Sequence, residues 1–220
     1  MEPYEVIIQF FQSGGPFMYP IAAVLALGLA IALERWLVLG TARIANRRAF
    51  DAAMTRLRER DYQAVIAAGK DSRVPMSRIV AAGIARFTGS RRRDDIESAM
   101  EEGVMEALPR LEKRTAYLAT LANVATLLGL LGTIVGLIAA FTAVASAEPA
   151  EKASMLSGSI SVAMNTTAFG LISAIPLLLL HAVLQTRTTE LVDSFEMASV
   201  KVLNTLSDLD VLPTRGRATD

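Results

Sequence analysis

The sequence predicts an all-α membrane protein with three transmembrane helices and long cytoplasmic helical extensions. Two uncharged runs, residues 115–147 and residues 153–186, each exceed the ~18–20 apolar residues that mark a membrane-spanning helix. A third uncharged run, residues 6–33, contains the dense apolar segment IAAVLALGLAIAL. An unbroken helix of 33 residues, the length of the second run, spans ~50 Å against a hydrocarbon core of ~30 Å. The helices are therefore expected to protrude into the cytoplasm.

The first transmembrane helix is expected at residues 17–39, after an N-terminal segment of residues 1–16. Glu2 and Glu5 are the only charged residues before Glu34, so the basic region of a cleaved signal peptide is missing. We therefore expect this helix to be retained. Glu34 and Arg35 at its inner end are interpreted as an ion pair, or as side chains that reach the interface beside Trp36.

Basic residues predict the orientation of the chain. Residues 40–118 hold 16 of the 22 Lys and Arg residues, whereas residues 1–16 hold none and residues 146–153 hold only Lys152. Basic residues near membrane ends favour the cytoplasm. We therefore expect residues 40–118 and the C-terminal residues 187–220 inside, and the N-terminal segment and the loop of residues 146–153 outside.

The cytoplasmic segment is predicted to be helical, with two breaks. Residues 43–69 are rich in helix formers and have apolar residues on one side, so one helical stretch is expected there. Residues 71–75 break the pattern, and Pro75 is well placed in the first turn of the next helix. Residues 88–90 break it again.

The two later transmembrane helices are expected to join cytoplasmic helices. From Asp94 a long helix should run into the second transmembrane helix, residues 119–145, with Pro109 kinking or interrupting it. The third transmembrane helix, residues 154–186, should continue into a helix over residues 188–206.

The second transmembrane helix has a small face and a polar side. The small face recurs every four residues and lets a neighbouring helix approach closely, in the same subunit or in another one: Gly132, Gly136 and Ala140. Asn123, Thr126 and Thr133 lie within ~80° of one another around the helix axis. A single membrane Thr more often bonds its own backbone. Three polar residues on one side favour a polar contact or a water-facing surface.

The third transmembrane helix is polar on several sides. One stripe consists of Ser154, Ser157, Ser161 and Asn165, and a second consists of Ser159, Thr166 and Ser173, with Thr167 between them. A helix that faces lipid has no use for such polarity, so we expect protein and water around it. Pro176 removes one backbone donor, and neighbouring helices should compensate the resulting kink.

The sequence carries no signal for an enzyme, a cofactor, a metal or a nucleic-acid partner. Lys and Arg number 22, Asp and Glu also number 22, and cysteine is absent. His181 is the only histidine and is interpreted as a packed or interfacial side chain. No phosphate-binding loop, zinc-protease motif or nucleophile elbow is present.

Two segments resemble the ExbB/TolQ/MotA family of ion-channel motor subunits. Residues 128–141, LGLLGTIVGLIAAF, are similar to the family's G-L-L-G-T-x-x-G block with a following Phe. Residues 166–176, TTAFGLISAIP, are similar to the T-A-x-G-L-x-x-A-I-P block of the ExbB and TolQ branch. The three-pass outline also suits that branch better than the four-pass flagellar branch. The chain departs from the branch at Val162, where a Glu is common, and at His181-Ala182, where Tyr-Asn is common.

The resemblance implies an oligomeric ring in the bacterial inner membrane. Five copies would enclose the single helices of a two-copy partner of the ExbD/TolR type, and a TonB-like energy transducer is a further candidate partner. Protons would cross between the ring and an Asp of the partner helix, which would drive rotation coupled to work at the cell envelope. The envelope process that is powered, and the choice of proton or sodium, stay open.

The resemblance also assigns residues to roles. Thr133 and Thr167 match the family's pore-facing threonines. With their polar neighbours they form the predicted ion-path and partner-facing set: Thr133, Thr167, Asn165, Thr166, Asn123 and Thr126. The predicted helix-packing set consists of Gly132, Gly136, Ala140, Gly170 and Pro176.

Two other function classes compete with a motor subunit. A structural membrane scaffold would pack around a partner without an ion path. A small-solute transporter is poorly supported, because transporters usually show internal repeats and intramembrane charge. Asp and Glu are absent from residues 115–147 and residues 153–186, so we expect the titrating carboxyl to lie on a partner helix.

Overall fold

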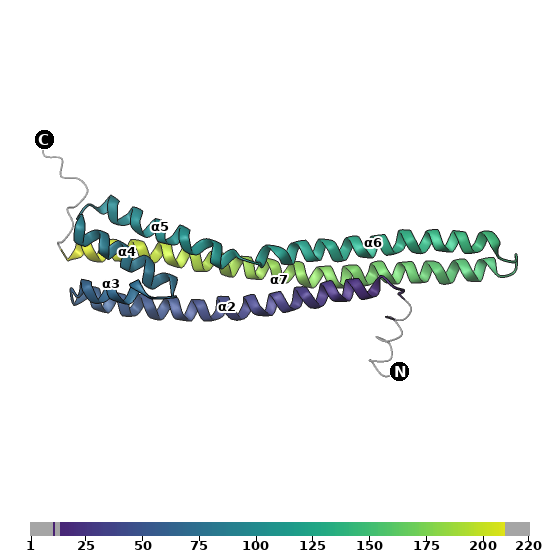
Figure 1. Ribbon diagram of the computed structural model, residues 1–220, viewed down its shortest axis with the longest axis horizontal. Coiled ribbons are helices and arrows are strands. Elements are labelled where there is room, and N and C mark those ends of the chain that lie inside the picture. Colours follow the sequence, from purple (N-terminus) through teal and green to yellow (C-terminus); the bar gives the residue numbers. More distant parts are fainter. Residues whose placement is uncertain (1–10, 12–13, 210–220) are drawn as a thin grey trace. The chain divides into compact units, whose positions relative to one another are not determined.

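The computed structural model describes residue 11 and residues 14–209, and each regular element in this part of the chain is an α-helix (Figure 1). The helices are α2 (Met18–Arg58), α3 (Tyr62–Lys70), α4 (Pro75–Gly89), α5 (Arg93–Glu112), α6 (Thr115–Ser146) and α7 (Lys152–Asp208). Three helical segments are long and apolar enough to cross a membrane: α2 (Met18–Arg58), α5 followed by α6 (Arg93–Ser146) and α7 (Lys152–Asp208). The predicted all-α membrane fold is therefore confirmed. Most of the expected N-terminal segment, and residues 210–220 of the expected C-terminal one, lie outside the described residues.

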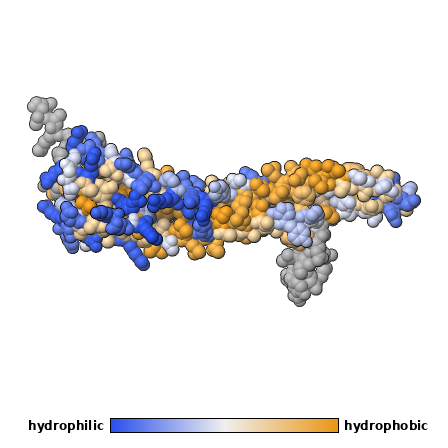
Figure 2. All heavy atoms as spheres, in the orientation of Figure 1, coloured by the Kyte–Doolittle hydropathy of each residue, from blue (hydrophilic) through white to orange (hydrophobic). Residues whose placement is uncertain are grey.

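The chain divides into two compact units. The apolar unit comprises Met1–Arg35 and Arg114–Leu184, and the charged unit comprises Trp36–Lys113 and Gln185–Asp220. Helices α2 and α7 contribute to both units, α6 belongs to the apolar unit, and α3, α4 and α5 belong to the charged unit. Hydrophobic residues gather over α6, and hydrophilic residues gather over α3, α4 and α5 (Figure 2). The division follows the charge pattern of the sequence.

Two predicted helix boundaries agree with the structure. Helix α2 begins at Met18, next to the expected start at Phe17. Helix α7 runs for 57 residues through Pro176 to Asp208, so the expected continuation over residues 188–206 is present. Between α6 and α7, Ala147 has extended backbone at φ −86° and ψ 154°, and Pro149 cannot extend the preceding helix.

The long helix expected from Asp94 into the second transmembrane segment is interrupted, but not at Pro109. Helix α5 continues through Pro109 to Glu112, and the N–H of Lys113 donates to the carbonyl of Pro109 at 3.1 Å. The break falls at Arg114, whose φ of 69° is left-handed. A proline removes only the bond to the carbonyl four residues earlier, so the last turn of α5 still closes after it.

The single helical stretch expected over residues 43–69 was wrong, because α2 ends at Arg58 and α3 begins at Tyr62. Arg60 adopts a left-handed φ of 61°. The carboxylate of Asp61 then accepts the N–H of Ala64 at 3.1 Å and caps the first turn of α3. Asp61 was therefore the sequence signal for this boundary.

The core of the charged unit consists of large side chains. Ile79, Ile84 and Phe87 of α4, Met100 of α5 and Phe195 of α7 are almost fully buried. Burying each such side chain stabilises the fold by about 1.5–3 kcal/mol.

The first turn of α4 lacks a cap from its own segment. Pro75 occupies the predicted first-turn position, and Val74 at the cap offers no side-chain acceptor. The Oδ1 atom of Asn46 on α2 instead accepts the N–H of Met76 at 3.1 Å, and Asn46 is only 2% exposed. This buried bond anchors the beginning of α4 to α2.

Candidate functional site

Helices α6 and α7 meet in the apolar unit at two glycines. A Cβ atom built on Gly170 would lie 2.8 Å from the carbonyl oxygen of Ala125 and 3.0 Å from the Cα of Gly129. A Cβ atom built on Gly129 would lie 3.2 Å from the Cα of Gly170. Because these neighbours are backbone atoms, no side chain can rotate to make room. The two backbones are in direct contact, as small residues permit between membrane helices.

The other small residues of α6 extend this contact, which we call the small-residue seam. A Cβ atom on Gly136 would lie 3.0 Å from the Cβ of Ala163, and one on Gly132 would overlap the side chain of Thr166. Ala140 is 1% exposed. Of the predicted helix-packing set, Gly132, Gly136 and Gly170 therefore lie where α6 meets α7, and Ala140 is buried on the same helix. Pro176 is exposed.

The first helix also packs on α7. A Cβ atom on Gly28 of α2 would overlap the side chain of Leu177, which is fully buried. Gly28 is buried as well. The seam side of α7 is therefore covered by α6 and by the N-terminal half of α2.

The threonine hydroxyls of the predicted ion-path set donate to backbone carbonyls. Thr126 donates to Ala122 at 3.1 Å and Thr133 to Leu130 at 2.6 Å, both within α6. Thr167 instead donates across the interface, to the carbonyl of Gly129 at 2.9 Å. Thr167 thus ties α7 to α6 beside the glycine contact.

Thr166 has a different environment from the other threonines. It is 2% exposed, and its Oγ1 lies 2.6 Å from the carbonyl of Gly14 and 2.9 Å from that of Val162. A hydroxyl has one proton, so it donates to one of these carbonyls at a time. Thr166 therefore faces the turn before α2 and lies inside the subunit.

The opposite side of α7 carries an uncovered polar stripe. Ser154, Ser157 and Ser161 are exposed and Asn165 is half-buried. At ~100° per residue these positions lie about 180° around α7 from the seam residues Ala163, Thr166 and Gly170. On α6, Asn123 is exposed too. The stripe lies in the uncharged run, so its serine hydroxyls are not covered by the part of the chain that the structure describes.

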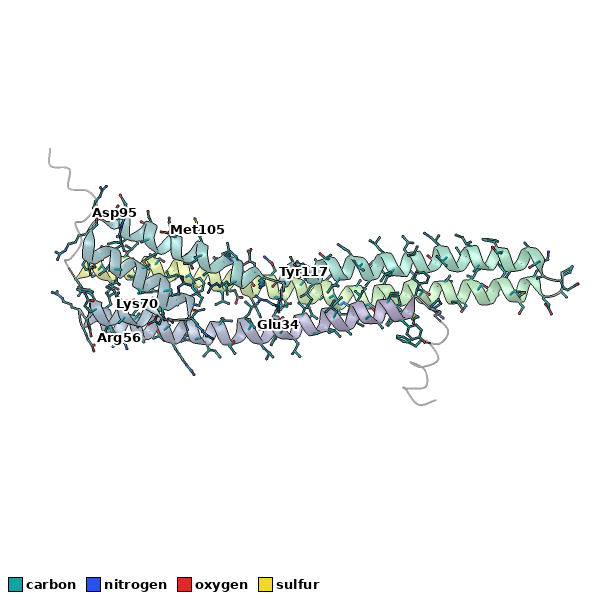
Figure 3. The ribbon with its side chains drawn as sticks, viewed as in Figure 1. Glu34, Arg56, Lys70, Asp95, Met105 and Tyr117 are labelled. Carbon is teal, nitrogen blue, oxygen red and sulfur yellow. The ribbon has the colours of Figure 1, made fainter. Side chains whose placement is uncertain are left out.

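A polar cluster lies at the α5–α6 junction, where the charged sequence gives way to the uncharged run. The carboxylate oxygens of Glu34 on α2 accept from a guanidinium nitrogen of Arg114 at 2.6 and 2.7 Å, and Glu34 faces this junction (Figure 3). The Nδ1 atom of His181 lies 3.0 Å from the backbone carbonyl of Thr115. The hydroxyl of Thr115 is buried and has no hydrogen-bond partner among the described residues. His181 is therefore packed against α6, as the sequence predicted.

Sequence reasoning missed Gly129 and Arg114 as important positions. Gly129 lies three residues before Gly132, so the two share a helix face, and this spacing was a usable signal. The ion pair of Arg114 with Glu34 joins residues 80 positions apart, so no local sequence pattern predicts it.

The arrangement provides polar groups that can bind water, but neither Asp nor Glu occurs within residues 115–147 or residues 153–186. Among the described residues, no group of three or more His, Asp or Glu side chains is placed to hold a metal ion. Hydroxyls and amides can order water, but they do not bind and release a proton as a carboxyl group can.

Comparison with known proteins adds a family. The model of the MotA/TolQ/ExbB proton channel family matches residues 71–197, more than half of the chain. The matched range includes all of α6 and the part of α7 that carries the seam and the polar stripe. No curated protein matches the chain.

Proposed function

This chain belongs to the MotA/TolQ/ExbB proton channel family, and we propose that it is the ring-forming subunit of a proton-motive-force-driven motor in the bacterial inner membrane. Several copies surround the membrane helices of an ExbD/TolR-like partner and couple ion flow to work at the cell envelope. The charged unit and the C-terminus lie in the cytoplasm, as the basic residues indicate.

The observation that carries this proposal is the contrast between the two sides of α7. Its seam side is closed by α6 and α2, whereas Ser154, Ser157 and Ser161 are exposed on the other side. Exposing this polarity to hydrocarbon is costly. Water, neighbouring subunits or a partner helix must cover it, and a ring with a wet interior supplies all three.

The proposed division of labour follows from the missing carboxylate. The ring supplies hydroxyls that hold water, and the partner supplies an intramembrane Asp that binds and releases the proton. Thr167 and Thr133 flank the seam on α7 and α6, and each hydroxyl oxygen keeps lone pairs that can accept from water. We assign the ion path to these two threonines with Asn165 and Asn123. Five copies and two partner chains follow from the family resemblance.

Proton flux into liposomes tests the proposal. Subunit and partner, taken as the single-pass protein with an intramembrane Asp that is encoded nearby, should together conduct protons, and the subunit alone should not. The partner's Asp→Asn variant should abolish flux. Robust, specific flux from the subunit alone would contradict the proposed division of labour.

Thr133→Val and Thr167→Val test the ring's share of the path. Each keeps the shape of the side chain and removes a hydroxyl, so flux should fall to the level of liposomes without partner while the oligomer persists. Thr142→Val is the control, because Thr142 lies on α6 and bonds its own helix at 2.9 Å from the carbonyl of Ile138. If both Thr133 and Thr167 variants conduct normally, the ion path lies elsewhere.

A structural scaffold is the second candidate, and one observation favours it. The hydroxyls of Thr126, Thr133 and Thr167 all donate to backbone carbonyls, as purely structural threonines do. A scaffold would assemble with the partner and conduct nothing in the liposome experiment.

A further inference from the structure

Helix α5 of the charged unit is flanked by two grooves. One groove has a volume of about 550 Å³ and is lined by α3, α4 and α5, with alanines on its floor. The other has a volume of about 510 Å³ and is lined by α5 and α7, with Val104, Met105 and Val200 among its apolar residues. We call them the basic groove and the acidic groove, after the charged residues that line them.

The two grooves lie on opposite flanks of α5. The buried stripe of α5 is formed by Ile96, Met100, Ala107 and Leu111. At ~100° per residue, Glu102 and Glu106 fall on one side of this stripe, and Glu101 and Met105 fall on the other. The two groove surfaces of α5 are then about 180° apart. Each copy of the chain therefore presents two different surfaces that face away from each other.

The charges at the two grooves are complementary. The acidic groove is lined by Glu97, Glu101 and Glu196 and by no basic residue. None of the three carboxylates has an ion-pair partner in the described part of the chain.

The basic groove has the opposite excess. Arg78 is paired with Glu106 at 2.6 Å. The remaining charged residues of this groove are three cations, Lys70, Arg73 and Arg110, and one carboxylate, Glu102. None of these four has an ion pair with another described residue. The basic groove therefore has a net excess of two positive charges, opposite in sign to the three carboxylates of the acidic groove.

The shapes are complementary as well. Met105 projects from α5 (Figure 3) and is 69% exposed, and Val200 on α7 is 47% exposed. The floor of the basic groove consists of small residues, among them Ala82, Ala85 and Ala99. A small-residue floor leaves room for a protruding apolar side chain.

We propose that the basic groove receives the acidic-groove face of a second copy of this chain, with Met105 and Val200 entering above the alanine floor. The contact is head-to-tail, because the two surfaces differ, and each docked copy leaves one further groove of each kind open. Every basic groove and every acidic groove is occupied only when the copies close into a ring. This inference rests on the proposed ring function and names the surface that joins its charged units.

Cysteine cross-linking tests the contact in the full-length chain, which has no cysteine of its own. A chain with Met105→Cys and Ala85→Cys should form a ladder of covalent oligomers on oxidation or with a short bismaleimide. Each single variant should stay monomeric on a denaturing gel. The matched control pairs Met105→Cys with Ala52→Cys, because Ala52 is exposed on α2 outside both grooves, and it should give no ladder.

Exchanging the charges of the two grooves provides a second test of the contact. Glu97→Lys with Glu101→Lys should weaken the oligomer in native mass spectrometry, and adding Lys70→Glu with Arg110→Glu to the same chain should restore it. Dimers of the Met105→Cys single variant, or failure of the exchange to restore assembly, would overturn the head-to-tail contact. An intact ring without the ladder would refute this contact alone, whereas a monomer in mild detergent would refute the proposed ring function itself.

Discussion

In the apolar unit a backbone-to-backbone helix contact brings together Gly129 and Gly170, which have no side chains. In the charged unit the helices pack around Phe87, Met100 and Phe195, which are among its largest side chains. Both units are built from long α-helices, and α2 and α7 take part in each. These two contacts use opposite residue types, although the charged unit also has a tight glycine contact where Gly69 of α3 meets Ser77 and Ala81 of α4.

The difference reflects the solvent that each unit faces. In water, burying a large apolar side chain is favourable in itself, so a helix pair gains stability from bulk. In a bilayer the lipid is as apolar as leucine, so helices gain mainly from close contact between backbones and from interhelical hydrogen bonds. The bond from Thr167 to the carbonyl of Gly129 beside the glycine contact is of this second kind. We therefore expect truncation of Phe195 to damage the charged unit and an added methyl group at Gly170 to damage the apolar unit.

Phe195→Ala should have the largest effect on stability. Phe195 is fully buried in the charged unit, and truncating a buried Phe costs about 3–5 kcal/mol. Thermal unfolding in mild detergent, followed by the fluorescence of Trp36, should show a clear loss of stability, because this single tryptophan belongs to the same unit. Met197→Ala is the control: Met197 lies two residues away and is 58% exposed, so its truncation should change little. Equal effects would mean that buried bulk does not stabilise this unit.

Gly170→Ala should have the next largest effect on stability. The added methyl group would meet the backbone at Ala125 and Gly129, and overpacking of this kind costs about 1–3 kcal/mol. Assembly and melting temperature in detergent should both fall. Gly158→Ala adds the same methyl group to the same helix with nothing within 4 Å, and should be neutral or stabilising by up to about 1 kcal/mol. A tolerated Gly170→Ala would show that the glycine contact is not needed.

Arg60→Gly should have the smallest effect and the opposite sign. Arg60 is exposed in the charged unit and has a left-handed φ of 61°, which glycine adopts without strain. Replacement should stabilise the unit by about 0.5–1 kcal/mol. Arg114→Gly removes the same kind of strain at a φ of 69° but also breaks the pair with Glu34, so it should gain less. A larger gain at Arg114 would mean that its ion pair contributes nothing.

The sequence was informative where structure depends on neighbouring residues. Apolar runs located the membrane helices, Pro75 located the first turn of α4, and helix formers after residue 187 located the continuation of α7. It was less informative where residues far apart in the chain meet. The cap that Asn46 gives α4 and the contact of Gly129 with Gly170 both depend on how helices cross.

The two helix breaks that the sequence analysis did not locate show the same limit at short range. Both occur at arginines with left-handed backbone, Arg60 and Arg114, and arginine is a good helix former. Only the capping residue Asp61 marked the first break, and no such residue marked the second. In the candidate site, the polar residues could be named from the sequence. Which of them is buried and which is exposed could not be named, because this depends on how α2, α6 and α7 pack. Thr166 is buried against Gly14, whereas the serines of the polar stripe are exposed.

In the proposed ring, the polar stripe of α7 faces water. Ser161→Cys in the subunit assembled without its partner, treated with a small hydrophilic thiol reagent, tests this directly in a chain without native cysteines. The control is Leu27→Cys, because Leu27 is 54% exposed on the apolar first helix and should face lipid. We expect labelling at Ser161→Cys and none at Leu27→Cys. A properly assembled Ser161→Cys protein that resists the reagent as fully as Leu27→Cys would contradict a wet path along this stripe.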